Sequence, residues 1–283
     1  MFKPPELLFC AALILFPALP ASATTSITSA AFGLSSTVKV INTVGVTVGP
    51  VGAVAGATAP GYAVTGNVAS LNTVVDLGVV ALVSAGLRLR TGVISTAASA
   101  NGTTPADTTS GDASALVNNL NISLFTTAIG SPVTALGLTA TSLNSQTQVV
   151  RIGNATTLQG QSTFSNLALS VLGVPILSLG ANATVAPNFL AYDLAGLRIL
   201  LNEQISGTGP GGVQTLLTNA LHISFNNFLL GGRALTGDII VSQSQASISF
   251  DPVPEPAAWT QLIAGFGLAG VALRRRRARQ PAA

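Results

Sequence analysis

Residues 221–225 read Leu-His-Ile-Ser-Phe, so apolar side chains alternate with polar ones. The same period of two recurs at 167–171, Leu-Ala-Leu-Ser-Val, and at 44–49, where three valines alternate with Gly, Thr and Gly. Successive side chains of a β-strand point to opposite faces, so this period predicts strands with one buried face. Sustained helical spacing of apolar residues is absent. The sequence therefore predicts an all-β fold, and we expect Ser and Thr to cover its outer faces.

An internal repeat favours hairpins. The segment 130–141, GSPVTALGLTAT, returns as 173–184, GVPILSLGANAT, and each copy is interpreted as two strands joined by a Pro-containing turn. A repeat of this size predicts stacked hairpins in a sandwich or an extended curved antiparallel sheet. The segment 100–112 is rich in Thr, Ser, Gly and Asp, and we expect a loop or a boundary between two lobes there.

Composition narrows the class of protein. The chain has 283 residues, of which only 7% are charged, and its net charge is +3. Between residues 24 and 252 there are six basic and seven acidic residues, so the basic balance comes from the arginines near the carboxyl end. Without clustered Lys and Arg in this region we expect no nucleic-acid partner. The single cysteine, Cys10, lies in a segment that we expect to be removed, which leaves no thiol for a disulfide or a metal site.

The amino-terminal residues 1–23 have the pattern of a secretory signal peptide. Lys3 supplies positive charge, Leu7–Phe16 is apolar, and Pro17 and Pro20 precede a small-x-small site for signal peptidase. Ala21 and Ala23 are the two small residues of that site. A helix of this apolar length would cross only about half of a bilayer core, so cleavage is expected rather than anchoring. Residues 24–252 are then the exported domain.

The carboxyl-terminal residues 253–283 contain a second addressing pattern. Two prolines lead into an uncharged segment, 257–273, that is just long enough to span a membrane as a helix, and a run of arginines follows that should stay in the cytoplasm. Trp259 is of the residue type that prefers the membrane interface. We therefore expect a single transmembrane helix over 257–273 with an Arg-rich cytoplasmic tail.

This arrangement resembles the PEP-CTERM sorting signal of Gram-negative bacteria, in the variant that reads PEPxxW, then GFG, then arginines. The matching residues are Pro254, Glu255, Pro256, Trp259, Gly265, Phe266, Gly267, Arg274, Arg275, Arg276 and Arg277. Thr260 replaces the usual Ala after Trp, and Gln261-Leu262 replaces the commoner Met pair. The resemblance implies processing by exosortase, a membrane transpeptidase, after transient anchoring. The final location would be the cell surface or the extracellular space.

The body resembles a second family, the choice-of-anchor P proteins. The shared strings are Leu201-Asn-Glu-Gln204, Thr218-Asn-Ala-Leu-His-Ile223 and the opening Ala31-Phe-Gly-Leu34. Members are exported bacterial proteins with a β-rich body that differ in how they are attached. This resemblance implies a location more than a mechanism.

Candidate catalytic residues in the body are few. His222 lies on the polar side of an expected strand, and it could serve a Ser/His/Asp triad, but no serine has a G-x-S-x-G context. Asp193, Glu203 and Asp238 could form the carboxylate pair of a glycosidase. Arg198 lies midway between Asp193 and Glu203, however, so cross-strand ion pairs are the preferred interpretation.

Two further motifs are interpreted as structural. Residues 207–212, GTGPGG, fit G-x-G-x-x-G, but the alternating segment that follows predicts a strand where a dinucleotide site needs a helix. Asp107 and Asp112 share one expected loop without the D-x-D-x-D spacing of a calcium site. We expect no catalytic residues, no cofactor and no metal.

These observations predict an exported, exosortase-sorted, non-catalytic protein of the cell surface or extracellular matrix, associated with exopolysaccharide or biofilm. Two alternatives remain. One is a binding module for a surface such as glycan or ice. The other is a polysaccharide-active hydrolase, which the scarcity of aromatic residues for sugar stacking disfavours.

Overall fold

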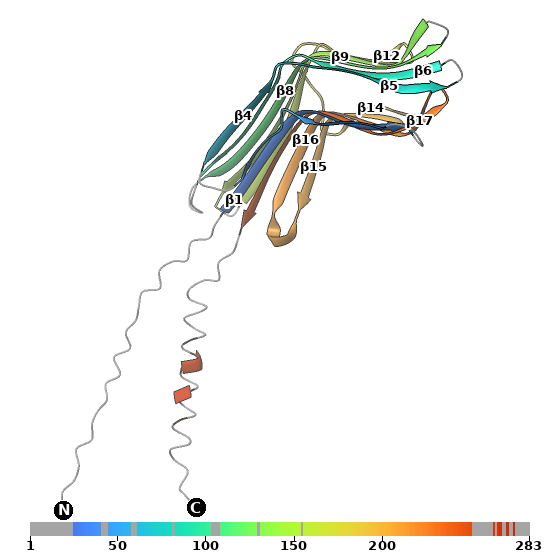
Figure 1. The fold of residues 1–283 in the computed structure, drawn as a ribbon. Coiled ribbons are helices and arrows are strands. Elements are labelled where there is room, and N and C mark those ends of the chain that lie inside the picture. Colours follow the sequence, from blue (N-terminus) through green and yellow to red (C-terminus); the bar gives the residue numbers. More distant parts are fainter. Residues whose placement is uncertain are drawn as a thin grey trace, which may run out of the picture. The chain divides into compact units, whose positions relative to one another are not determined.

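A computed structural model describes residues 25–40, 45–57, 61–80, 83–102, 108–128, 131–153, 155–250, 263, 265–267, 270–271 and 274. Residues Thr24–Asp251 form one compact unit. Its strands form two antiparallel sheets, which confirms the prediction of an all-β fold (Figure 1). The two ends of segment 100–112 pair with each other as a hairpin within one sheet, since Asn101 pairs with Ser110 and Ala100 with Gly111.

The seven-stranded sheet has the order β14-β15-β16-β17-β1-β2, and β3 also pairs with β1. Its strands are β1 (Thr25–Val40), β2 (Gly45–Val51), β3 (Val54–Ala57), β14 (Phe189–Leu194), β15 (Leu197–Thr208), β16 (Gln214–Leu230) and β17 (Arg233–Phe250). A short 3-10 helix, η1 (Pro210–Gly212), connects β15 to β16. The first and last of these strands are neighbours, since Thr25 pairs with Phe250.

The ten-stranded sheet is built on two long central strands, β8 and β9, which pair along most of their length. Beside one half of this pair, β6 and β5 lie on the side of β8, and β11 and β12 lie on the side of β9. Beside the other half, β7 and β4 lie on the side of β8, and β10 and β13 lie on the side of β9. The strands are β4 (Tyr62–Val68), β5 (Leu71–Val80), β6 (Val83–Thr91), β7 (Ile94–Asn101), β8 (Thr109–Ala128), β9 (Ser131–Ile152), β10 (Ala155–Ser165), β11 (Leu167–Val171), β12 (Val174–Leu179) and β13 (Ala183–Thr184).

Both sheets bend midway along their long strands (Figure 1). The registers align one row of residues at this point, the corner row: Asn202, Ala220, Ser242 and Gly33 in the seven-stranded sheet, and Asn119 and Thr141 in the other. Asn119, Asn202 and Ser242 have φ values of 48°, 52° and 57°, in the left-handed region that non-glycine residues rarely adopt. The alternation of inward and outward side chains changes phase here: in β8 the buried positions are odd up to Val117 and even from Leu120. Because of this change of phase, the same face of each sheet points toward the core on both sides of the bend.

The corner row divides the unit into two arms with different interiors. The leucine arm contains β2, β5, β6, β11, β12 and β14 with the adjoining halves of the long strands, and its core is made of large aliphatic residues such as Leu87, Leu124 and Ile223. The serine arm contains β3, β4, β7, β10 and β13 with the other halves. Small and hydroxylic residues there lie between the sheets, among them Ala113, Ala115 and Thr147. Burial of apolar surface is the main stabilising contribution in the leucine arm.

Hydroxyl groups join the two sheets in the serine arm. Thr147 Oγ1 on β9 lies 2.8 Å from both Thr218 Oγ1 on β16 and Ser244 Oγ on β17. Ser242 Oγ donates to the carbonyl oxygen of Ala115 at 2.6 Å. Ser and Thr were expected on the outer faces, and exposed positions such as Thr157 lie there, but others lie between the sheets. The buried hydroxyls of Thr147 and Ser242 bond to other hydroxyls and to backbone carbonyls.

The repeated prolines do not lie in turns. Pro132 and Pro175 are each the second residue of a strand, β9 and β12, and the hairpin turn comes before them. Pro132 pairs with Thr127 and Pro175 with Ser170. Each copy of the repeat thus begins with the return strand of a hairpin, where a proline is tolerated near the strand start, and the second copy also contains β13.

No helix in the described part of the chain is long and apolar enough to cross a membrane. The transmembrane helix expected over 257–273 is therefore not supported, although much of that segment lies outside the described residues. The described positions there, including Gly265, Phe266, Gly267 and Gly270, are helical and exposed.

Candidate functional site

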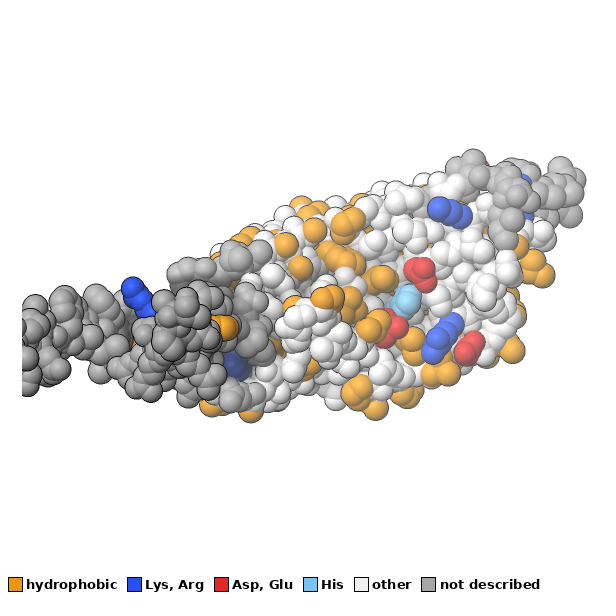
Figure 2. Space-filling view, turned by 90° about the horizontal axis from the view of Figure 1, so that it is seen from below, with side chains coloured by type: hydrophobic (Ala, Val, Ile, Leu, Met, Phe, Trp, Pro, Cys, Tyr) orange, Lys and Arg blue, Asp and Glu red, His pale blue; other side chains and the backbone are white. Residues whose placement is uncertain are grey.

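The single histidine lies in a cluster of polar side chains on the outer face of the seven-stranded sheet, next to the corner row. We call Glu203, Asn219, His222, Asp238 and Gln243 the histidine cluster. They come from the neighbouring strands β15, β16 and β17. Leu221 and Ile223 are buried, so His222 between them faces outward, as the alternation at 221–225 predicted. Figure 2 shows the histidine on this face between two acidic side chains.

Both ring nitrogens of His222 contact carboxylates. Nδ1 lies 2.8 Å from Oε2 of Glu203, and Nε2 lies 3.1 Å from Oδ1 of Asp238. Asn219 Nδ2 donates to the same Glu203 oxygen at 2.7 Å, and Gln243 Nε2 donates to Asn219 Oδ1 at 2.7 Å. A neutral imidazole has only one N–H, so this geometry fits the doubly protonated ring, which donates to both carboxylates.

The electrostatics of the cluster agree with its geometry. The hydrogen bond to Glu203 raises the pKa of His222 above its ordinary value of 6.5, and the negative charges of Glu203 and Asp238 add to this against the opposing effect of burial. Burial alone would raise the pKa of Glu203. The hydrogen bonds from His222 and Asn219 and the charge of His222 outweigh it, so the pKa falls below 4.5. The ion pairs of His222 with Glu203 and Asp238 therefore connect three neighbouring strands, and we call this pair of contacts the ion-paired clasp.

This arrangement differs from that of a catalytic triad. In a triad one ring nitrogen of the histidine faces the nucleophile and the other an orienting carboxylate. Here both nitrogens face carboxylates, and Glu203 is only 12% exposed. The expected ion pair between Asp193 and Arg198 is confirmed on neighbouring strands, with Nε to Oδ2 at 3.9 Å and both side chains exposed. Glu203 pairs with His222 instead of Arg198.

The remaining motifs have structural positions. Residues 207–212 form the end of β15 and the η1 turn, and a strand follows, as expected. Within the described residues, no group of three or more His, Cys, Asp or Glu side chains is placed to hold a metal ion.

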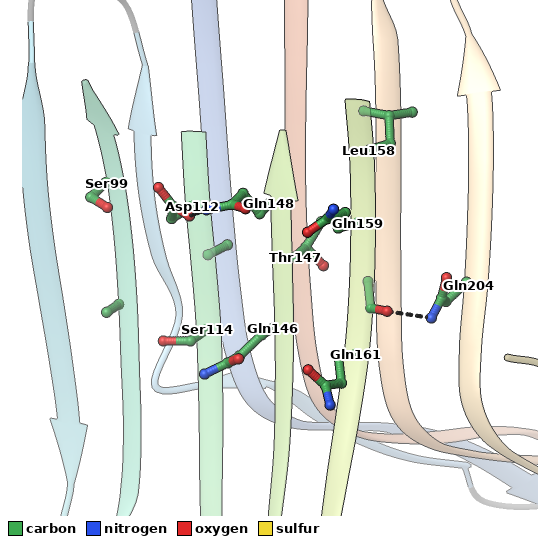
Figure 3. Close-up of a pocket in the computed structure, with 13 residues that line it drawn as sticks. Ser99, Asp112, Ser114, Gln146, Thr147, Gln148, Leu158, Gln159, Gln161 and Gln204 are labelled. Atoms are coloured by element: carbon green, nitrogen blue, oxygen red, sulfur yellow. Dashed lines mark hydrogen bonds between the residues drawn. The ribbon is translucent and has the colours of Figure 1, made fainter. Parts of the chain in front are cut away.

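A second polar feature lies on the ten-stranded sheet in the serine arm. An open groove of about 640 Å³ crosses β7, β8, β9 and β10, and we call it the amide groove (Figure 3). Its outward-facing side chains are Ala97, Ser99, Asp112, Ser114, Gln146, Gln148, Gln159 and Gln161. Leu158, Gly160, Ala113, Thr147 and Gln204 complete the lining. The face points away from the other sheet, since Thr147 between the outward-facing Gln146 and Gln148 bonds to β16 and β17.

The registers arrange these side chains in two rows. One row runs Ser99–Asp112–Gln148–Gln159 and the other Ala97–Ser114–Gln146–Gln161. Gln148 Nε2 donates to Asp112 Oδ1 at 2.7 Å, and Gln204 from β15 closes one side by donating to Gly160 O at 2.7 Å. Sequence reasoning missed the groove. The strings Gln146-Thr-Gln148 and Gln159-Gly-Gln161 could have revealed it, because each places two amides on one face of a strand.

Most residues of the expected signal-peptidase site and of the sorting signal are not described by the structure. Both cleavage-site alanines and most of the sorting-signal residues lie outside the described residues: Ala21, Ala23, Pro254, Glu255, Pro256, Trp259, Arg275, Arg276 and Arg277. Arg274 and the Gly265–Gly267 segment are helical and exposed. Their roles remain predictions from the sequence.

Comparison with known proteins identifies the carboxyl-terminal region. Residues 252–277 match the family model of the PEP-CTERM protein-sorting motif. No curated protein and no solved structure matches the chain. The resemblance of the body to the choice-of-anchor P proteins is thus not supported. The motif implies exosortase-dependent export, with a cell-surface or extracellular location.

Proposed function

We propose that the mature chain is a non-catalytic protein of the cell surface or extracellular matrix, associated with exopolysaccharide in a biofilm. The observation that carries this proposal is the sorting motif at residues 252–277. Signal peptidase would remove residues 1–23, and exosortase would cleave near Pro254–Pro256 and release or attach the body.

Two features of the body support a binding or structural role rather than catalysis. The described histidine is occupied at both ring nitrogens by carboxylates, so neither is available as a general base. The outer face of the serine arm is lined by amides and hydroxyls, which suit an association with a hydroxyl-rich polymer.

Intact mass of the protein from native cells tests the sorting step. We expect the wild-type strain to yield a chain that lacks residues 1–23 and the residues after the Pro254–Pro256 site, and a strain without exosortase to keep the tail. A Glu255→Ala variant in the wild-type strain should also keep the tail. An intact tail in both strains would refute exosortase processing.

Fractionation of the culture tests the location and the role. The wild-type protein should be found with the extracellular polysaccharide, and the purified protein should not degrade it. Release of reducing ends from that polysaccharide by the purified protein would instead support the hydrolase.

A glycan-binding module is the second candidate, favoured by the amide groove. The rows of the groove carry Gln, Ser and Asp instead of the regular ranks of Thr that an ice-binding face would need. Glycan is therefore preferred to ice as the ligand surface.

A further inference from the structure

We propose that the amide groove binds an uncharged polysaccharide chain laid across strands β7 to β10. This inference rests on the proposed function and gives it a site and a ligand class. It comes from the placement of the groove side chains, their free hydrogen-bonding capacity and their charge.

The groove is wide enough for a chain segment and not only for a single small molecule. Its two rows each cross four neighbouring strands. Strands lie about 4.8 Å apart, so each row is about 14 Å long, and the rows are separated by about 7 Å along the strands. The groove is open and not enclosed, which allows a polymer to enter from the side and to continue beyond it.

The amides have capacity for a ligand. Gln146, Gln159 and Gln161 make no side-chain hydrogen bonds with other described residues, whereas Gln148 donates to Asp112. Each free amide has two N–H donors and a carbonyl acceptor, and a sugar hydroxyl also donates and accepts. Because Gln146 and Gln161 are paired across β9 and β10, one ligand can contact both.

Charge restricts the class of polymer. Among the described residues that line the groove, Asp112 is the only ionisable one, and none of them is a cation. Acidic polymers are bound through Lys and Arg, and here they would meet only a carboxylate. An uncharged polymer avoids this repulsion, and its hydroxyl groups can form hydrogen bonds with the amides.

The groove suits a polysaccharide better than a polypeptide. An added peptide strand pairs with a free sheet edge, but this groove lies on the face of paired strands. Apolar peptide side chains would find little beyond Leu158 to contact. Because none of the described residues that line the groove is aromatic, we expect no contribution from ring stacking and an affinity that increases with chain length.

The test uses the mature protein and exopolysaccharide from the producing cells, separated by anion exchange into neutral and acidic fractions. Affinity electrophoresis should show retardation by the neutral fraction and little by the acidic one. Replacing Gln146 and Gln161 together by alanine removes two amide contacts, and binding should weaken about tenfold or more. The control Gln245→Ala, on the outer face of the other sheet, should bind as the wild type does.

A variant that gains binding complements the alanine variant, because misfolding cannot explain a gain of binding. Gln161 is exposed, so Gln161→Lys should fold normally, as circular dichroism would verify, and should gain binding to the acidic fraction. Preference of the wild type for the acidic fraction would overturn the ligand class. Neutral-fraction binding that survives the double alanine change would overturn the site while the proposed function stands. If the wild type binds neither fraction, the polysaccharide association itself is refuted, whatever the mass measurement shows about sorting.

Discussion

Replacing His222 by alanine should lower the free energy of unfolding by about 2–3 kcal/mol in mildly acidic solution and by much less in alkaline solution. The contact with Glu203 at 2.8 Å joins charged groups, and that carboxylate is only 12% exposed. A hydrogen bond of this kind contributes about 1.5–3 kcal/mol. The contact with Asp238 ends on a carboxylate that is 47% exposed, so solvent reduces its contribution to under about 1 kcal/mol.

The direction of the pH dependence follows from the two pKa shifts. The raised pKa of His222 means that its stabilisation is complete below 6.5 and is lost as the pH rises through the folded-state value. The lowered pKa of Glu203 means that its stabilisation is present above 4.5 and is lost as the pH falls through the folded-state value. The clasp should therefore be strongest between these two ordinary values, and above that range the neutral ring retains one hydrogen bond at most.

Urea unfolding followed by circular dichroism measures this effect, since the only tryptophan lies in the sorting tail. Wild type and His222→Ala would be compared at about pH 5.5, within the range where both groups are charged, and at about pH 9. Asp193→Asn breaks an exposed ion pair and serves as the control, with an expected change under about 0.5 kcal/mol at both pH values. An equal loss of stability for His222→Ala at the two pH values would refute the ion-paired clasp.

Two further changes test the interior and the corner. Thr147→Val should destabilise the protein by about 1–3 kcal/mol in urea unfolding, because Thr218 and Ser244 lose a buried partner, whereas Thr157→Val at the surface should change stability by less than about 0.5 kcal/mol. If the two variants are equally stable, the buried hydroxyls do not hold the sheets together. Asn119→Ala should cost about 1–2 kcal/mol at its φ of 48°, whereas Asn119→Gly should be close to neutral in thermal unfolding. A glycine variant as unstable as the alanine variant would show that the left-handed conformation is not what position 119 requires.

The fold class could be predicted because alternation in short segments survives in the structure. Leu167, Leu169 and Val171 are buried on β11, and the outward position of His222 follows from its buried neighbours. The bend could not be predicted, since it depends on a left-handed conformation at Ser242, whose residue type is common elsewhere in the chain. Pairing between residues as distant as Thr25 and Phe250 also leaves no local signal.

The candidate sites were predictable to different degrees. Spacing alone indicated the ion pair of Asp193 with Arg198, because both residues sit near one hairpin turn. It could not indicate Glu203 beside His222, because the register of β15 on β16 is set by the whole sheet. Composition also could not distinguish Ser and Thr side chains that are exposed to solvent from those that are buried, such as Thr147, since the residue types are the same.

The pairing of β1 with β17 has a consequence for the order in which the protein can fold. During export the amino-terminal strand crosses the membrane first, and β17, which lies between β16 and β1, crosses last. The centre of the seven-stranded sheet therefore stays open until synthesis and translocation of the body are almost finished. Contacts between such distant parts of a chain form slowly, and unpaired strand edges promote aggregation in the meantime. We expect the exported chain to depend on a chaperone in its new compartment until its last strand arrives, directly ahead of the sorting motif that begins at residue 252.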